Sequence, residues 1–114
     1  MGAGYKDLVV WQKAMQLTKE VYKITEQFPS EEKFGLVSQM RRSAVSIPSN
    51  IAEGSRRGNK EFNHFLRVAL GSASELETQI ELAVELYMCD PQTFRDVEKY
   101  LNEVLKMLTK MVKF

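Results

Sequence analysis

The amino-acid sequence predicts an all-α fold, an up-down-up-down antiparallel four-helix bundle built by one domain over residues 1–114. Four segments of about 20–28 residues repeat apolar residues at alternating spacings of three and four, the pattern of helices that pack on one another. Helix-forming residues dominate these segments, and the chain holds only three Pro and six Gly. The connections are only a few residues long, so successive helices should run antiparallel.

The first helix is expected over residues 7–28. Its apolar seam consists of Val10, Ala14, Leu17, Val21, Ile24 and Phe28. Pro29 cannot continue a helix and therefore ends this one. Ser30 is a suitable N-cap for the next helix, and Glu31 and Glu32 place negative charge in its first turn.

The second helix is expected over residues 31–55. Its core face consists of Leu36, Met40, Ala44, Ile47 and Ile51. Pro48 lies inside it, where it removes one backbone hydrogen bond and crowds the carbonyl of Ala44. The sequence therefore predicts a kink or a short irregular turn over residues 46–49.

The third and fourth helices are expected over residues 60–88 and 91–113. Asn59 should cap the third helix, while Asp90 followed by Pro91 is a strong start signal for the fourth. The third seam consists of Phe62, Leu66, Ala69, Ala73, Leu76, Ile80, Ala83 and Tyr87. The fourth consists of Phe94, Val97, Leu101, Val104, Leu108 and Met111, widened by Leu105 and Val112.

The third helix carries more apolar surface than one seam needs. A second strip lies beside its core seam and consists of Phe65, Val68, Ser72, Gln79 and Leu86. An exposed apolar strip on a small protein usually marks an interface, and symmetric homo-oligomers are its commonest use. The sequence therefore predicts self-association; the alternative is that this helix is simply the central one of the bundle.

The second helix carries a polar strip that core packing does not require. The strip and its helix-breaking neighbours form a candidate structural or interface motif of Gln39, Arg42, Ser46, Pro48, Ser49, Asn50, Glu53 and Gly54. Ser46, Ser49 and Asn50 are placed to satisfy backbone groups freed by Pro48. Pairing of Arg42 and Glu53 with a neighbouring helix or subunit is expected, and a binding role for the strip is the alternative.

The charges are unevenly distributed, although the formal net charge is only +1. Residues 75–90 contain five acids and no base. Positively charged residues cluster in a candidate nucleic-acid-binding group of Arg41, Arg42, Arg56, Arg57, Lys60 and Arg67. Phosphate contacts need only positioned cations, so this group predicts salt-sensitive binding of RNA or DNA with little sequence preference. Ordinary solvated helix surfaces are the alternative.

Catalytic and metal sites are not expected, and neither is a cofactor. A di-iron bundle needs two Glu-x-x-His pairs, whereas the chain has one, Glu61 to His64. A metal-independent ribonuclease that uses His64 for proton transfer and Arg57 for phosphate stabilisation is the remaining catalytic alternative. A single cysteine, Cys89, and the absence of a secretory leader favour the cytoplasm, and a membrane span is not expected.

Residues 35–54, GLVSQMRRSAVSIPSNIAEG, carry a family resemblance that continues upstream at 8–11 and downstream at 69–72 and 75–77. This pattern resembles the 23S ribosomal RNA intervening-sequence protein family, bundle proteins often encoded within bacterial 23S rRNA genes. It is also similar to the accessory variability proteins of diversity-generating retroelements. The resemblance implies a homopentamer that associates with nucleic acid and with a reverse transcriptase. A non-catalytic accessory or adaptor protein is therefore expected, with a pure protein-interaction scaffold as the alternative.

Overall fold

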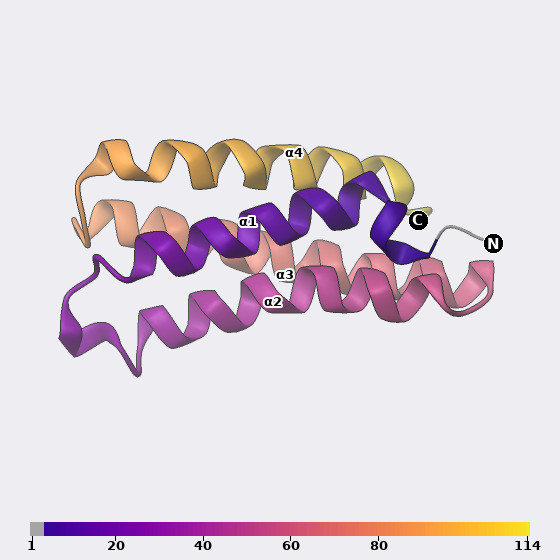
Figure 1. The fold of residues 1–114 in the computed structure, drawn as a ribbon, viewed down its shortest axis with the longest axis horizontal. Coiled ribbons are helices and arrows are strands. Elements are labelled where there is room, and N and C mark those ends of the chain that lie inside the picture. The colour runs from indigo at the N-terminus through magenta and orange to yellow at the C-terminus, as the bar shows by residue number, and fades with distance from the viewer. Residues whose placement is uncertain (1–3) are drawn as a thin grey trace.

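The computed structural model of the protein describes residues 4–114, and four long helices dominate it. They are α1 (Val9–Thr25), α2 (Leu36–Ser55), α3 (Asn59–Glu85) and α4 (Arg95–Met111). Three short 3-10 turns, Tyr5–Asp7, Ser30–Glu32 and Pro91–Phe94, precede α1, α2 and α4. The helices lie side by side along the 44 Å long axis (Figure 1). The predicted all-α class is confirmed.

The helices alternate in direction along the chain (Figure 1). Each packs against its neighbour in sequence, and α4 closes the bundle against α1. The cross-helix contacts have antiparallel register, since Ser43 on α2 bonds Glu75 on α3 while Ser46, further along α2, bonds the earlier Ser72. The topology is therefore up-down-up-down.

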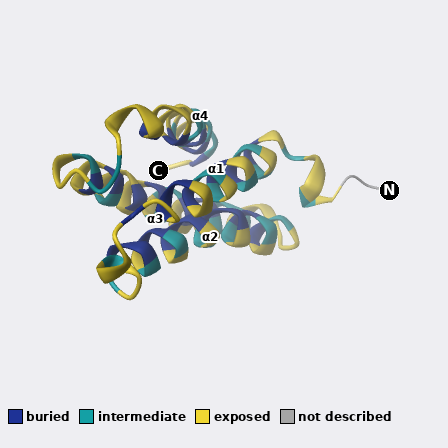
Figure 2. Cartoon of the chain, turned by 60° about the vertical axis from the view of Figure 1, so that its left-hand side comes forward, coloured by how far each residue is buried: buried dark blue, intermediate teal, exposed yellow. Residues whose placement is uncertain are grey.

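The core is made of the predicted seams. The whole α1 seam, the α2 core face and the α3 seam from Leu66 to Ala83 are buried, as are the α4 seam residues from Phe94 to Leu108. Figure 2 shows buried and exposed stretches alternating along the helices. Phe62 and Met111 are only partly buried at its end. Tyr87 is 79% exposed, so its assignment to the α3 seam was wrong.

The second helix begins at Leu36 rather than at residue 31. Gly35 has φ −105° and ψ −111°, outside the helical region, and it separates the turn at Ser30–Glu32 from α2. Ser30 makes no side-chain cap. Instead the Leu36 N–H donates to Glu32 Oε1 at 3.3 Å, so an acidic side chain satisfies the first turn of α2.

The other helix ends differ from the prediction by a few residues. The first helix stops at Thr25, and buried Phe28 follows in the connection. Asp90 does cap a turn, since its Oδ1 accepts from the Gln92 N–H at 3.0 Å, but that turn is the 3-10 segment and α4 itself begins at Arg95. Asn59 is the first residue of α3, not its cap.

The third helix ends at Glu85 rather than at residue 88 because the chain turns left-handed at Tyr87, where φ is 53°. The Met88 N–H donates to the Ala83 carbonyl and the Tyr87 N–H to the Val84 carbonyl. This pair of hydrogen bonds is a Schellman motif, which satisfies the last carbonyls of a helix. A non-glycine residue carries the backbone strain of that turn.

Pro48 does not interrupt α2, so the irregular turn predicted over residues 46–49 is not formed. The carbonyl of Ala44 loses its usual donor because Pro48 has no N–H. The Thr18 hydroxyl of α1 lies 3.1 Å from this oxygen and 2.8 Å from the Ala14 carbonyl of its own helix, so its one hydrogen is shared between the two acceptors. Asn50 bonds within its own turn, to Ser46, so it does not satisfy the freed group.

Candidate nucleic-acid interface

The turn between α2 and α3 and both described ends of the chain gather at one end of the bundle (Figure 1). Side-chain contacts tie these segments together. Asn63 near the start of α3 exchanges hydrogen bonds with the backbone of Lys113, at 2.7 and 2.9 Å. The Arg56 guanidinium lies 5.4 Å from the centre of the Tyr5 ring. We call the half of the bundle at this end, residues 4–16, 46–72 and 104–114, the basic half.

The basic half holds nine Lys and Arg side chains and three carboxylates. The opposite half, residues 17–45 and 73–103, holds seven Lys and Arg side chains and twelve carboxylates, and we call it the acidic half. The fold therefore separates charge along the long axis, with a net charge of about +6 on the basic half and about −5 on the acidic half (Figure 1). A net charge near zero conceals this field, which favours anions at the basic half.

Three of the predicted cations stand on the basic half without a carboxylate partner among residues 4–114. Arg56 and Lys60 flank the turn between α2 and α3, and both are exposed. Arg67 is exposed about two turns beyond Lys60 along α3, with its guanidinium 5.7 Å from the centre of the Phe114 ring. Exposed cations of this kind can contact phosphate at little desolvation cost.

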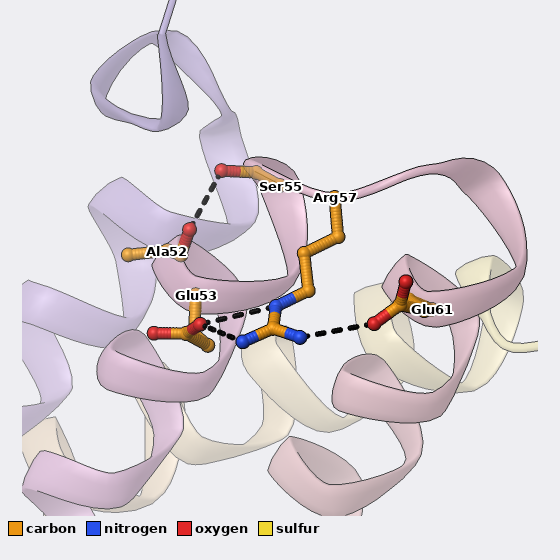
Figure 3. Close-up of polar contacts among 5 residues, drawn as sticks. All are labelled: Ala52, Glu53, Ser55, Arg57 and Glu61. Atoms are coloured by element: carbon orange, nitrogen blue, oxygen red, sulfur yellow. Dashed lines mark hydrogen bonds and ion pairs between the residues drawn. The ribbon is translucent and has the colours of Figure 1, made fainter.

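Arg57 differs from these three because two carboxylates hold it, as Figure 3 shows. Its Nη2 lies 2.6 Å from Glu53 Oε2 and its Nη1 lies 3.0 Å from Glu61 Oε2. Hydrogen bonds to Glu53 and then Glu61 raise the pKa of Arg57 above its usual value. The residue bridges the end of α2 and the start of α3, and its charge is already offset.

His64 is exposed on the first turns of α3, with its ring edge-on to Phe65 at 5.4 Å. The Arg57 guanidinium lies over the Phe65 ring, 5.1 Å from its centre, yet no hydrogen bond joins Arg57 to His64 in residues 4–114. Phosphate stabilisation by Arg57 would require it to leave two carboxylates. The geometry therefore gives the ribonuclease alternative no support.

Arg41 and Arg42 lie on the acidic half, about 20 Å along α2 from Arg56 at 1.5 Å per residue. The six cations of the predicted group consequently do not form one surface. Arg41 is held by α1, because its Nε donates to Thr25 Oγ1 at 2.9 Å and its guanidinium stacks 4.5 Å from the centre of the Tyr22 ring. Arg42 is exposed.

Gly54 brings α2 and α3 together just before the turn. A Cβ at this position would lie 2.6 Å from Phe65 Cβ and 3.0 Å from Phe62 Cδ1, closer than side-chain carbons approach. Only glycine permits this helix separation without a shift. Its role in the predicted motif is therefore steric: it fixes the spacing of the two helices that present Arg56 and Lys60.

The rest of the polar strip on α2 faces α3 across a groove of about 490 Å³. Ser46 Oγ bonds Ser72 Oγ at 2.8 Å, and buried Ser43 donates to Glu75 Oε1 at 3.2 Å. Within residues 4–114, the buried Gln79 Oε1 has no hydrogen-bond partner. The groove is lined by Phe34, Ser38, Gln39, Arg42, Ser43, Ser46, Ser72, Glu75 and Gln79.

Some members of the predicted motif have other surroundings. Ser49 is exposed, Pro48 is buried, and Glu53 pairs with Arg57 rather than with a groove residue. Ser43 and Glu75 are groove residues that were not among the predicted ones. Ser43, Ser46 and Asn50 are spaced three and four apart on α2, which is the signal that could have found Ser43.

Metal ligands do not cluster in residues 4–114, where no three His, Cys, Asp or Glu side chains are grouped to hold an ion. Over the same residues, none of the helices combines the length and the apolar character that crossing a bilayer demands. The site is thus described by exposed cations, stacked aromatic rings and a polar groove.

Comparison with known proteins supplies the family. The profile of the family described as 23S rRNA-intervening sequence protein matches residues 6–110, nearly the whole chain. The chain belongs to this family. A crystal structure from Bacteroides thetaiotaomicron, described as a protein with unknown function from the S23 ribosomal protein family, is similar in fold, with a TM-score of 0.83. The two are 25% identical over 93% of this chain and 100% of that one. No curated protein gives a significant match.

The resemblance inferred from residues 35–54 is therefore confirmed at the level of family and fold. The family description names no activity, and the structural neighbour is itself of unknown function. What this member does must be argued from its own surface.

Proposed function

We propose that this 23S rRNA-intervening sequence protein is a non-catalytic, self-associating accessory protein of the cytoplasm that binds nucleic acid through its basic half. The observation that carries the proposal is the separation of charge along the bundle, with nine cations against three carboxylates at one end. Arg56, Lys60 and Arg67 are the expected phosphate contacts, because they are exposed and no carboxylate engages them within residues 4–114.

Phosphate binding of this kind is governed by counterion release. For single strands the logarithm of affinity falls with the logarithm of salt concentration with a slope of about −0.7 for each phosphate contacted. Affinity from Arg56, Lys60 and Arg67 would therefore be high at low salt and fall steeply at moderate salt. These contacts reach the backbone and not the base edges, so little sequence preference is expected.

The test is fluorescence anisotropy of a labelled RNA of mixed sequence, titrated with the protein at several salt concentrations. The double variant Arg56→Gln, Lys60→Gln should weaken binding and reduce the salt slope by about 1.4. Its control is Lys19→Gln, Lys99→Gln, which removes the same charge from exposed positions in the acidic half. Equal losses in both variants would mean that net charge, not the basic half, drives binding.

Self-association is favoured by the outer face of α3. Val68, Leu82 and Leu86 are 39%, 46% and 54% exposed and repeat at helical spacing beside the groove. Burying these apolar side chains against a second copy would stabilise an assembly. A homopentamer is the assembly expected from the family resemblance, with a reverse transcriptase as a further partner.

Light scattering tests this second part. Leu82→Glu with Leu86→Glu should reduce the molar mass to that of one chain, because a charge cannot be buried in an apolar contact without a partner. Val9→Glu is the control, since Val9 is 56% exposed on α1. A multimer that withstands the α3 variant would place the contact elsewhere. A multimer indifferent to RNA at low salt would make the protein a pure interaction scaffold.

A further inference from the structure

Phe34 is an exposed aromatic residue in the connection between the Ser30–Glu32 turn and α2. Its relative exposure is 89%, the highest among the large apolar side chains of residues 4–114. It stands beside a surface depression of about 500 Å³ that α1 and α2 line together, which we call the Phe34 pocket. The ring contributes little to the core, and its aromatic surface is accessible to a ligand.

The Phe34 pocket is positively charged although it lies on the acidic half. Its lining includes three cations and no carboxylate: Tyr22, Lys33, Phe34, Val37, Ser38, Arg41, Arg42 and Val45. The carboxylate of Glu32, the residue before Lys33, accepts a hydrogen bond from the Leu36 N–H and does not line the pocket. Lys33, Arg41 and Arg42 in this lining attract an anion, although the half of the bundle around them is acidic.

The cations differ in how they are held. Arg41 is fixed in place by its hydrogen bond to Thr25 Oγ1 and by stacking on Tyr22. A guanidinium has five N–H donors, and Arg41 uses one on Thr25 and one on the Tyr22 carbonyl, which leaves three for a ligand. Lys33 Nζ lies 5.6 Å from the centre of the Phe34 ring. The arrangement therefore combines one cation held by hydrogen bonds, two further cations and an exposed aromatic ring.

From this geometry we infer that the Phe34 pocket binds one nucleotide of single-stranded nucleic acid, with the base stacked on Phe34 and its phosphate on Arg41 and Arg42. The inference rests on the proposed function and adds a preference for unpaired strands. A base inside a duplex has no free face, whereas every unpaired base has one, so an aromatic platform with adjacent cations selects single strands without reading their sequence.

Photocrosslinking locates the stacked base directly. A single-stranded RNA with 5-iodouracil at each uridine is mixed with the full chain at low salt, irradiated and digested, and the modified peptides are identified by mass spectrometry. The crosslink is expected on Phe34, in the peptide that follows Lys33. Crosslinks confined to Tyr5 or Phe114, the aromatic residues beside Arg56 and Arg67, would overturn the Phe34 pocket and leave the basic half as the only binding surface.

Substitution gives an independent result. Phe34→Ala should lower affinity for single-stranded RNA about 5- to 150-fold, the range for loss of one stacked base, and leave affinity for a duplex of the same length unchanged. Tyr87→Ala is the control, because Tyr87 is also an exposed aromatic residue, 79% accessible, outside the pocket. Equal affinity of Phe34→Ala and the native chain for single strands would refute the pocket while RNA binding itself stands.

Two further outcomes separate this inference from the proposed function. If the native protein binds no RNA at low salt, both fall together. If Phe34→Ala changes the number of subunits in light scattering, the ring contacts another copy and the nucleotide site is overturned. Circular dichroism should be unchanged in Phe34→Ala, since the ring is 89% exposed and contributes little to the core.

Discussion

The close approach of α2 and α3 at Gly54 provides a sharp test of the structure. In Gly54→Ala the new Cβ would lie 2.6 Å from Phe65 Cβ, and ordinary contact begins near 3.4 Å. Both atoms adjoin backbone, so the helices must separate by almost 1 Å. Overpacking of this kind costs about 1–3 kcal/mol, and the better helix propensity of Ala returns about 0.5–1 kcal/mol. The free energy of unfolding should therefore fall by about 1–2 kcal/mol.

Urea unfolding followed by circular dichroism measures this change, and Gly71→Ala is its matched control. Gly71 is also helical, but a Cβ there would meet nothing within 4 Å. Gly71→Ala should therefore raise the free energy of unfolding by about 0.5–1 kcal/mol, through propensity alone. If Gly54→Ala were as stabilising as Gly71→Ala, the two helices would not be in contact at Gly54, and the reasoning would be refuted.

Three further predictions concern single residues. Tyr87→Gly should stabilise the protein by about 0.5–1 kcal/mol, because glycine adopts φ 53° without strain; a loss in thermal unfolding would contradict this. Thr18→Val should cost about 0.5–1.5 kcal/mol, since the hydroxyl shared by the Ala14 and Ala44 carbonyls is lost; urea unfolding checks it, and no change would show that water serves equally. A hydrogen bond shared with Glu85 raises the pKa of Glu81 above its usual 4.5, so the folded state binds this proton more tightly. The stability that this pair contributes is therefore present below pH 4.5 and lost as pH rises through the raised pKa of Glu81. Glu81→Gln should flatten that part of a curve of unfolding free energy against pH. An unaltered curve would contradict a contribution of the Glu81–Glu85 pair to stability.

The seams of the bundle could be read from sequence because apolar spacing is set by the helix period. Ala14, Ala44 and Ala73 all occupy the core as their spacing requires, and each is fully buried. The helix starts were less predictable. Ser30 is a residue type that often caps helices, yet the backbone of Gly35 leaves the helical region and Glu32 satisfies the first turn of α2. This start depends on the backbone angles at Gly35, which the spacing of apolar residues does not indicate.

The candidate site was predictable only in part. Arg56 and Lys60 follow from the local charge count, whereas the offset charge of Arg57 depends on Glu53 and Glu61 meeting it across a turn. The division of charge between the two halves needs the topology, because it brings residues 4–16 and 104–114 beside 46–72. Phe34 carries a weak sequence signal, an aromatic residue in a connection next to Lys33.

The central proposal is a self-associating bundle whose basic half binds nucleic acid. Light scattering of the native chain at low and at moderate salt, with and without an RNA of mixed sequence, measures both properties in one experiment. The account predicts a multimer that gains mass with RNA at low salt and loses it at moderate salt, because counterions displace the phosphate contacts. A single chain whose mass ignores RNA at low salt would contradict it.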